Sequence, residues 1–311
     1  MSDPVVEELR AAGVADVRSG ASLAELTTLR VGGPARLLVT VERDGELAAV
    51  GELASRHGLP WVVVGRGSNL LVADEGWPGI AIVLGRGYRG VTFEEPVDGR
   101  GRLRAGGAEP LPSLAVRVAD AGYAGFAWAC AVPGTLGGAV RMNAGAHGAD
   151  MATHLIEVDL VRLSTGVRET WPLATLGLAY RHSELPSDAV VVSATLELPQ
   201  GDPDVVRSEI AEIRAWRRAH QPLNQPNCGS VFTNPPGESA GRLIDAAGCK
   251  GLAIGGAAIS DRHANFIVTR PGARAADVLA LIAEVTARVE ATTGIQLTTE
   301  VVRLAPSPVA P

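Results

Sequence analysis

The stretch AVPGTLGGAVRMNAGAHG, residues 131–148, is the most informative part of this 311-residue sequence. Its closely spaced glycines add little apolar core, so we expect the stretch to contribute backbone shape. Gly137 and Gly138 permit close packing against a flat or charged ligand, and Thr135 and Asn143 can supply hydrogen bonds. We call this stretch the downstream glycine-rich segment. Paired tight turns without a ligand are the alternative interpretation.

An upstream glycine-rich segment, GRGSNLLV (65–72), follows the strand-like run WVVV (61–64). Successive N–H groups in such a loop can form a concave site for a diphosphate. The pattern is not GxGxxG and no capped helix follows it, which disfavours a Rossmann domain. A plain glycine turn between strands is the alternative. Together, the two segments suit a long ligand with a central diphosphate, such as a dinucleotide.

Composition excludes several classes of protein. Acidic side chains outnumber basic ones by 34 to 28, for a net charge of −6, and without a basic tract we expect no nucleic-acid partner. The apolar runs are too short to cross a bilayer, and the N-terminus lacks the order of a signal peptide. The three cysteines have no CxxC spacing, so we expect neither a disulfide framework nor a metal site. A cytoplasmic protein without a membrane partner is the expectation.

Apolar periodicity indicates an α+β fold with two or three subdomains. It predicts helices at 4–12, 44–57, 111–121, 205–219, 238–248 and 275–292, and strands at 35–41, 61–64, 80–84, 155–163, 189–198 and 295–304. The alternation in 155–163, with a Ser-Thr-Gly turn after it, predicts a hairpin.

Three single residues are candidates for chemistry. Arg181, in AYRHS, can bind a carboxylate, although a surface ion pair is the alternative. Ser230, in NCGSVFTNP, lacks both a GxSxG elbow and a suitably spaced histidine, so it is no hydrolase nucleophile, and a plain turn serine is the alternative. If alternation holds to the end of the last strand, Glu300 shares a half-buried face with Val302 and Leu304. There it is paired or raised in pKa, unless it is an ordinary strand-edge glutamate.

Four arginines form a basic stripe on the helix predicted at 205–219. They are Arg207, Arg214, Arg217 and Arg218. A solvated helix face is one interpretation, and an anchor for a nucleotide phosphate is the other.

The order of these motifs resembles the UDP-N-acetylenolpyruvoylglucosamine reductase family. The matching stretches are TTLRVGGPARLLV, VGRGSNLLVADEG, VPGTLGGAVRMNAGAHG, YRHS, QPLNQPNCGSVFTNP, AGRLIDAAGCKGLAIGGAAISDRHANFIV and GIQLTTEVVRL, running from about residue 23 to residue 304. The QPLNQPNCGSVF form resembles the family's shorter subtype. Thr233 stands where the family commonly has Lys or Arg.

The resemblance implies an FAD-binding domain of the vanillyl-alcohol-oxidase (PCMH) type at 23–198, after an N-terminal helix and lead-in at 1–22. A smaller α+β substrate-binding domain at 199–304 and a tail at 305–311 follow. The implied reaction is the reduction of UDP-N-acetylglucosamine enolpyruvate to UDP-N-acetylmuramate in peptidoglycan precursor synthesis, with non-covalent FAD and with NADPH as co-substrate. We expect a monomer acting on this small molecule.

The resemblance also assigns residues. Arg181 and Glu300 would stabilise the charge that develops on the substrate, and Ser230 would donate the proton. The implied FAD contacts are Gly65, Gly67, Ser68, Asn69, Leu70, Pro133, Gly134, Thr135, Gly137, Gly138, Asn143 and Gly145. The implied substrate contacts are Tyr180, Arg214, Arg218 and Asn234.

Two rival functions remain open from the sequence. One is another FAD-dependent oxidase of the same superfamily, for which His147 is the nearest residue for covalent attachment. The other is a catalytically silent nucleotide-binding protein.

Overall fold

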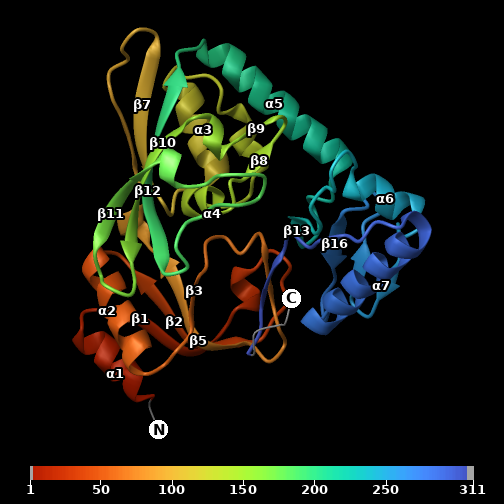
Figure 1. Ribbon diagram of the computed structural model, residues 1–311, viewed down its shortest axis with the longest axis horizontal. Coiled ribbons are helices and arrows are strands. Elements are labelled where there is room, and N and C mark those ends of the chain that lie inside the picture. Colours follow the sequence, from red (N-terminus) through yellow and green to blue (C-terminus); the bar gives the residue numbers. More distant parts are fainter. Residues whose placement is uncertain (1–2, 307–311) are drawn as a thin grey trace. The chain divides into compact units, whose positions relative to one another are not determined.

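The computed structural model describes residues 3–306 and divides the chain into two compact units (Figure 1). Within the described residues, the first unit takes in the chain up to Ser19, Leu37–Arg66 and Gly79–Trp216. The second takes in Gly20–Arg36, Gly67–Pro78 and the chain from Arg217 onward. Residues 1–2 of the predicted lead-in and 307–311 of the predicted tail lie outside the described range.

The N-terminal part contains a four-stranded sheet with two helices. The strand order is β1 (Asp16–Ser22), β2 (Pro34–Val41), β5 (Trp77–Leu84) and β3 (Trp61–Val63), and the helices are α1 (Pro4–Ala11) and α2 (Asp44–Arg56). Helix α1 begins after Asp3, whose carboxylate accepts a hydrogen bond from the N–H of Val5 at 3.1 Å. Its apolar face is buried, because Val5, Val6 and Leu9 are each at most 4% exposed. These elements confirm the predicted helices and strands of this region.

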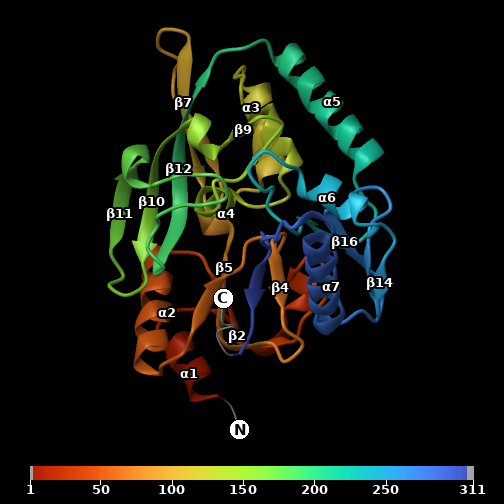
Figure 2. The ribbon, with the colours of Figure 1, turned by 45° about the vertical axis from the view of Figure 1, so that its right-hand side comes forward.

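The rest of the first unit is built on a five-stranded antiparallel sheet. Its order is β11 (Arg168–Pro172), β10 (Leu155–Arg162), β12 (Ala189–Pro199), β7 (Arg100–Gly106) and β6 (Val91–Phe93). The predicted hairpin is confirmed, with Val158 opposite Trp171. Helices α3 (Leu111–Asp120) and α4 (Leu136–Arg141) lie beside this sheet (Figures 1 and 2) and share one apolar core with it. The hairpin β8 (Gly145–Ala146) and β9 (Ala149–Asp150) follows α4.

The second unit has its own core around a small antiparallel sheet. The sheet order is β13 (Asn227–Ser230), β16 (Phe266–Thr269), β15 (Ala257–Ile259) and β14 (Ala253–Ile254), with helices α6 (Ala240–Ala246) and α7 (Ala275–Thr293). A parallel pair is formed by β4 (Leu70–Val72) and β17 (Val302–Leu304). Asp74 caps α7 by accepting from the N–H groups of Ala275 and Ala276 at 2.8 and 3.0 Å. The apolar residues of this unit form a core cluster separate from those of the first unit.

Short elements and one long helix complete the chain. The 3-10 helices are η1 (Ala24–Leu26), η2 (Arg86–Tyr88), η3 (Ala127–Ala131), η4 (Met151–Thr153) and η5 (Leu173–Thr175), and the long helix is α5 (Pro203–His220). Among the described residues, no helix combines the length and apolar character needed to cross a membrane. The mixture of helices and mainly antiparallel sheets confirms the predicted α+β class.

The last predicted strand is wrong in length and in alternation. Of residues 295–304, only β17 is a strand, and Thr299 forms an isolated bridge with Phe232. Leu297 and Val301 are buried on one face as alternation requires, but Val302 and Arg303 are both exposed and Leu304 is buried, so the alternation breaks after Val301. The reason is that the N–H of Glu300 donates to the carbonyl of Val231, whereas the N–H of Val302 donates to the carbonyl of Asn69. A single period-two pattern cannot hold across that change of partner.

Candidate active site

The downstream glycine-rich segment forms a short capped helix, which the sequence interpretation did not include. The hydroxyl of Thr135 accepts from the N–H of Gly138 at 3.4 Å and caps α4. A Cβ placed on Gly137 would meet the carbonyl oxygens of Val191 and Gly107 at 3.0 and 3.1 Å. A Cβ on Gly138 would meet only the Thr135 hydroxyl, at 3.5 Å. Gly137 therefore serves close packing inside the unit, while Gly138 presents an open backbone face.

The two glycine-rich segments meet in the first unit. A Cβ on Gly65 would lie 2.7 Å from the Thr135 hydroxyl, so a larger residue would require the Thr135 side chain to move. Gly134 is tied down by the N–H of Leu111, which donates to its carbonyl at 3.1 Å, and Pro133 beside it is exposed. None of the N–H groups of residues 65–68 has an acceptor in the described part of the chain. Unpaired N–H groups in a glycine-rich loop fit a phosphate-bearing ligand.

Asn143 is a buried junction between three segments. It has a left-handed backbone with φ of 38°. Its Nδ2 donates to Asp150 Oδ2 at 3.1 Å and to the carbonyl of Ala179 at 3.0 Å, and its Oδ1 accepts from the N–H of Ala152 at 3.0 Å. Both amide hydrogens are thus engaged inside the protein. A contact between Asn143 and FAD would need its backbone or the remaining lone pair of Oδ1.

Arg181 lies in a tight turn next to the downstream glycine-rich segment. Its φ of 55° is left-handed, and Ala179 and His182 exchange two hydrogen bonds of 3.1 Å around it. Its Nη2 donates to the carbonyl of Gly145 at 3.1 Å. The guanidinium carbon also stands 5.0 Å from the ring centroid of Tyr180, a side chain that is 56% exposed. The first unit therefore brings together Arg181, Tyr180 and Gly145, all three of which the sequence singled out.

Arg141 holds the loop that carries Arg181, and the sequence interpretation missed it. Its Nη1 donates to the carbonyls of Leu185 and Pro186 at 3.0 Å each, and its Nη2 donates to the carbonyl of Ala189. The hydroxyl of Ser183 returns a bond of 2.7 Å to the Arg141 carbonyl. Burial lowers the pKa of the Arg141 guanidinium. The only signal in the sequence was a single arginine in a stretch of otherwise apolar and glycine residues, LGGAVR.

Ser230 and Glu300 lie on neighbouring segments of the second unit. Ser230 ends β13 and pairs with Phe266 of β16. The N–H of Glu300 donates to the carbonyl of Val231, the residue after Ser230, at 2.8 Å. Asn69, predicted as an FAD contact, donates through Nδ2 to the Glu300 carbonyl at 3.1 Å. The backbone of Glu300 is therefore fixed from both sides.

The rest of the upstream glycine-rich segment is anchored in the same unit. Gly67 has φ of 60°, and a Cβ there would collide with the carbonyl oxygen of Leu26 at 2.0 Å. Its own carbonyl accepts from the N–H of Thr28 at 3.1 Å. Leu70, two residues after Ser68, then pairs with Val302 as β4 meets β17. This pairing joins the segment to the strand that follows Glu300.

Two further side chains bear on this part of the site. Asn234 accepts through Oδ1 from the N–H of Ala240 at 3.0 Å, at the start of α6. Burial raises the pKa of the Cys228 thiol to about 12, and the Glu300 carboxylate adds to the rise. Cys228 therefore stays protonated and is no nucleophile at neutral pH.

The arginines of α5 have different surroundings. Arg207 pairs with Asp120 and Asp204, at 2.9 Å each. Arg214 and Arg218 have exposed side chains. Local carboxylates therefore neutralise Arg207, and Arg217 donates through Nε to Gln221 Oε1 at 2.8 Å. The other two arginines of the stripe, Arg214 and Arg218, are the ones predicted as substrate contacts.

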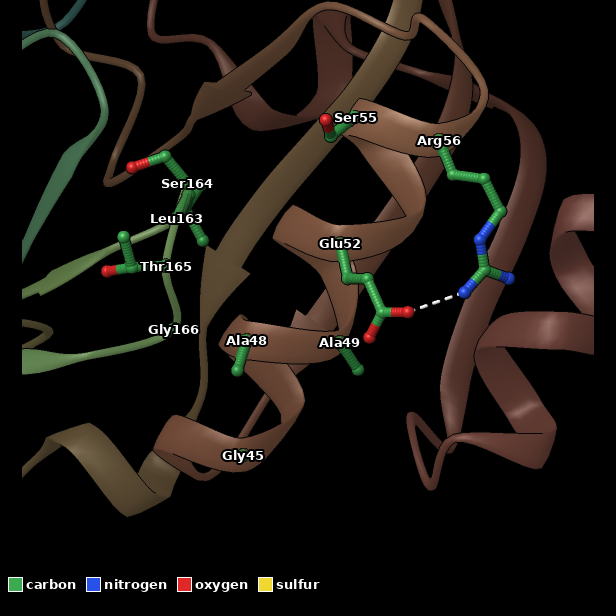
Figure 3. Close-up of a pocket in the computed structure, with 10 residues that line it drawn as sticks. All are labelled: Gly45, Ala48, Ala49, Glu52, Ser55, Arg56, Leu163, Ser164, Thr165 and Gly166. Atoms are coloured by element: carbon green, nitrogen blue, oxygen red, sulfur yellow. Dashed lines mark hydrogen bonds and ion pairs between the residues drawn. The ribbon is translucent and has the colours of Figure 1, made fainter.

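A hollow of about 570 Å³ lies elsewhere on the first unit, between α2 and the turn that joins β10 to β11 (Figure 3). It is lined by Gly45, Ala48, Ala49, Glu52, Ser55, Arg56, Leu163, Ser164, Thr165 and Gly166. Its charged residues Glu52 and Arg56 pair with each other at 2.5 Å. No predicted site residue lines this hollow, so it adds nothing to the candidate active site.

Comparison with known families gives two matches within the chain. Residues 221–304 match the model of the UDP-N-acetylenolpyruvoylglucosamine reductase C-terminal domain. Residues 35–170 match the model of an FAD binding domain.

Whole proteins of one kind are similar over most of the chain. The UDP-N-acetylenolpyruvoylglucosamine reductase of Heliobacterium modesticaldum is 49% identical over 277 residues, covering 88% of this chain and 86% of that protein. The same-named protein of Syntrophotalea carbinolica is 43% identical over 285 residues, covering 92% and 93%. The crystal structure of UDP-N-acetylenolpyruvylglucosamine reductase from Thermus caldophilus superposes with a TM-score of 0.78 at 36% identity, covering 93% of this chain and 98% of that one.

Proposed function

The chain belongs to the UDP-N-acetylenolpyruvoylglucosamine reductase family, and we propose that Arg181, Ser230 and Glu300 perform the charge and proton chemistry of its reaction. That reaction is the NADPH-dependent reduction of UDP-N-acetylglucosamine enolpyruvate to UDP-N-acetylmuramate through FAD, in peptidoglycan precursor synthesis. The predicted family, activity and cofactor are confirmed. The residue roles are the part that we propose.

The two glycine-rich segments would hold FAD without a covalent bond. The open face of Gly138 and the unpaired N–H groups of residues 65–68 support this assignment, because they offer donors and space that the fold itself does not use. When bound, FAD supplies the hydride equivalent that it takes from NADPH. The domain limits at 23–198 and 199–304 stay predictions.

Arg181, as a cation, and Glu300, as an acid that donates a hydrogen bond, would stabilise the negative charge that develops on the substrate. Hydride addition to the terminal enolpyruvyl carbon leaves charge on the adjacent carbon and its carboxylate. A guanidinium stays positive at all working pH values, and a preorganised cation lowers the free energy of such a transition state. The bond from Arg181 to the Gly145 carbonyl supports preorganisation, because it restrains the guanidinium before substrate binds.

Ser230 would donate the proton that completes the reduction at the adjacent carbon. A serine hydroxyl is a weak acid, so it serves only a strongly basic carbanion in a site closed to water. The observation that supports this role most directly is the 2.8 Å bond from the Glu300 N–H to the carbonyl of Val231. Because Val231 directly follows Ser230, this bond holds the backbone of Glu300 next to that of Ser230.

Exposed polar residues would bind the nucleotide sugar. We propose Tyr180, Arg214, Arg218 and Asn234 for this role; their support is the exposure of Tyr180 and of the two arginines. We further propose that the enzyme works as a monomer in the cytoplasm. Light scattering of the purified protein tests the first of these statements.

Anaerobic stopped-flow absorbance of the flavin tests the proton donor. In Ser230→Ala, we expect flavin reduction by NADPH to stay within about twofold of wild type. Reoxidation by the enolpyruvyl nucleotide sugar should slow about a thousandfold, because the proton source is gone. Ser260→Ala is the matched control, since this buried serine of the same unit only accepts a structural bond from the Arg262 N–H. Equal losses in both half-reactions of the Ser230 variant would refute the assignment.

The same instrument tests the charge-stabilising pair. Arg181→Ala and Glu300→Ala should reduce the limiting rate of the second half-reaction more than they weaken substrate binding. This result is expected because their interactions strengthen as charge develops in the transition state. A variant that only raises the substrate concentration needed for half-saturation would instead mark its residue as a binding group.

A further inference from the structure

The segment that follows Ser230 is held along both of its edges. On one edge, the N–H of Glu300 donates to the carbonyl of Val231 at 2.8 Å, and the N–H of Thr233 donates to the carbonyl of Thr298 at 2.9 Å. These two bonds pair the carbonyl of Val231 and the N–H of Thr233 with the segment 298–300. The backbone groups of the intervening residue point to the opposite edge.

The opposite edge is formed by one residue, Asn265, through its backbone and its side chain. Its backbone carbonyl accepts from the N–H of Val231 at 2.9 Å. Its side-chain Oδ1 accepts from the N–H of Phe232 at 2.9 Å, and its Nδ2 donates to the carbonyl of Phe232 at 2.8 Å. A carboxamide therefore takes the place of the peptide group that a neighbouring strand would supply.

Burial makes this pairing hard to replace. Asn265 is 4% exposed and Phe232 is 1% exposed, so water cannot readily substitute for the amide. On the other side of Ser230, the ladder between β13 and β16 is already irregular, with a register shift between Asn227 and Ser230 and a left-handed Gly229. Regular strand pairing alone therefore does not fix the direction of the Ser230 side chain.

We infer that Asn265 is a positioning residue for the reaction, which orients the Ser230 hydroxyl by clamping the peptide of Phe232. The inference rests on the proposed role of Ser230 as proton donor. Asn265 bonds the backbone of Phe232, two residues after Ser230, and acts on Ser230 through that backbone. Without the clamp, Ser230 can shift relative to the substrate carbon, and shifts of this kind slow a proton transfer sharply.

Asn265→Ala in the FAD-loaded enzyme tests the inference by stopped-flow absorbance. We expect reoxidation by the enolpyruvyl nucleotide sugar to slow about a hundredfold, while flavin reduction by NADPH stays within about twofold. Equal slowing of both half-reactions would overturn the inference, because a general loss of structure has no preference for one of them.

Thr269→Val is the matched control. Thr269 ends β16, the strand that begins directly after Asn265; it is 5% exposed and donates to the carbonyl of Leu29 at 2.6 Å. Its replacement also removes a buried bond between side chain and backbone, but none to the segment after Ser230. We expect both half-reactions of Thr269→Val to match wild type. If this variant slows reoxidation as much as Asn265→Ala does, the inference is wrong.

A second variant, Asn265→Asp, keeps the inference testable if Asn265→Ala does not fold. Asn265→Asp keeps the side-chain shape and the acceptor for the Phe232 N–H, and it loses the donor to the Phe232 carbonyl. It should slow reoxidation in the same selective way as the alanine variant. Reoxidation at the wild-type rate in Asn265→Asp would overturn the inference.

A double variant separates this inference from the proposed function. If Asn265 acts through Ser230, Ser230→Ala with Asn265→Ala should reoxidise no more slowly than Ser230→Ala alone. A further slowing by the full single-variant factor would overturn the inference and leave the proton donor intact. If Ser230→Ala alone has no selective effect, the proposed function itself fails.

Discussion

Two adjacent glycines in α4 have different roles, and alanine substitution distinguishes them. In Gly138→Ala, the new methyl group contacts only the Thr135 hydroxyl at 3.5 Å, within a helix. The free energy of unfolding of the FAD-free protein should stay constant or rise by up to about 1 kcal/mol, because alanine favours helix. FAD affinity should fall, since the methyl group fills the proposed cofactor surface. Urea unfolding and a fluorescence titration with FAD measure the two effects.

Gly137→Ala provides the comparison. Its methyl group would meet the carbonyl oxygens of Val191 and Gly107 at 3.0 and 3.1 Å, so the unit must shift to accept it. We expect this variant to lose about 1–3 kcal/mol of stability. Unchanged FAD binding by Gly138→Ala would remove the downstream glycine-rich segment from the cofactor site.

At the level of the element, Arg141 ties α4 to the loop that carries Arg181. Arg141→Met keeps much of the side-chain volume and removes the guanidinium donors to the carbonyls of Leu185, Pro186 and Ala189, although the Pro186 carbonyl still accepts from the N–H of Ala189 at 3.0 Å. The loss of these buried bonds should cost about 3 kcal/mol of unfolding free energy, measured by urea denaturation.

Arg207→Met is the control for this measurement. Arg207 pairs with two exposed aspartates, Asp120 at the end of α3 and Asp204 in the first turn of α5, and pairs of this kind contribute little to stability. Its unfolding midpoint should stay close to that of wild type. If Arg141→Met unfolds at the same urea concentration as Arg207→Met, the buried guanidinium does not hold the loop.

Local patterns predicted the elements whose partners lie nearby in the chain. The hairpin of β10 and β11 follows from alternation and a glycine turn, and Val158 pairs with Trp171 as such a hairpin requires. The last strand failed because its partners are remote. The N–H of Glu300 bonds Val231, and that of Val302 bonds the carbonyl of Asn69 at 3.0 Å, so neighbouring peptides serve different segments.

The candidate site shows the same division. Its motifs, such as the glycines of both segments and Ser230 after Gly229, are visible because they are local. Asn265 and Arg141 are not visible, because their importance lies in the carbonyls and N–H groups that they reach. Those partners are 33 residues away for Asn265 and 44 or more for Arg141.

In the whole molecule, the proposed catalytic residues are divided between the two compact units. Arg181 belongs to the first unit, whereas Ser230 and Glu300 belong to the second. Each unit has its own buried apolar clusters. Each unit therefore carries part of the proposed set of residues, and the reactivity of the cysteines reports whether the core of each unit stays closed.

The thiols of the three cysteines should not react with a disulfide reagent in the native protein and should react once the protein unfolds. Cys130 is buried in the first unit, and Cys228 and Cys249 are buried in the second. Burial raises the pKa of both Cys228 and Cys249, which removes the reactive thiolate. A chromogenic disulfide reagent at neutral pH should detect no rapidly reacting thiol in the native enzyme, and three in denaturant. A rapid native reaction would mean that one core opens readily.

The raised pKa of Cys228 also predicts how stability depends on alkaline pH. The folded thiol titrates at about 12, whereas an ordinary cysteine titrates at 9.0. Below pH 9.0 both states hold the proton and the favourable contribution of Cys228 is complete. As pH rises from 9.0 towards about 12, the unfolded chain releases its proton first, so the free energy of unfolding falls. Cys228→Ala removes this titration, so its unfolding free energy should fall less than that of wild type between about pH 8 and about pH 10.5. Parallel pH curves for the two proteins, measured by urea unfolding, would show that the Cys228 thiol is not held neutral by the fold.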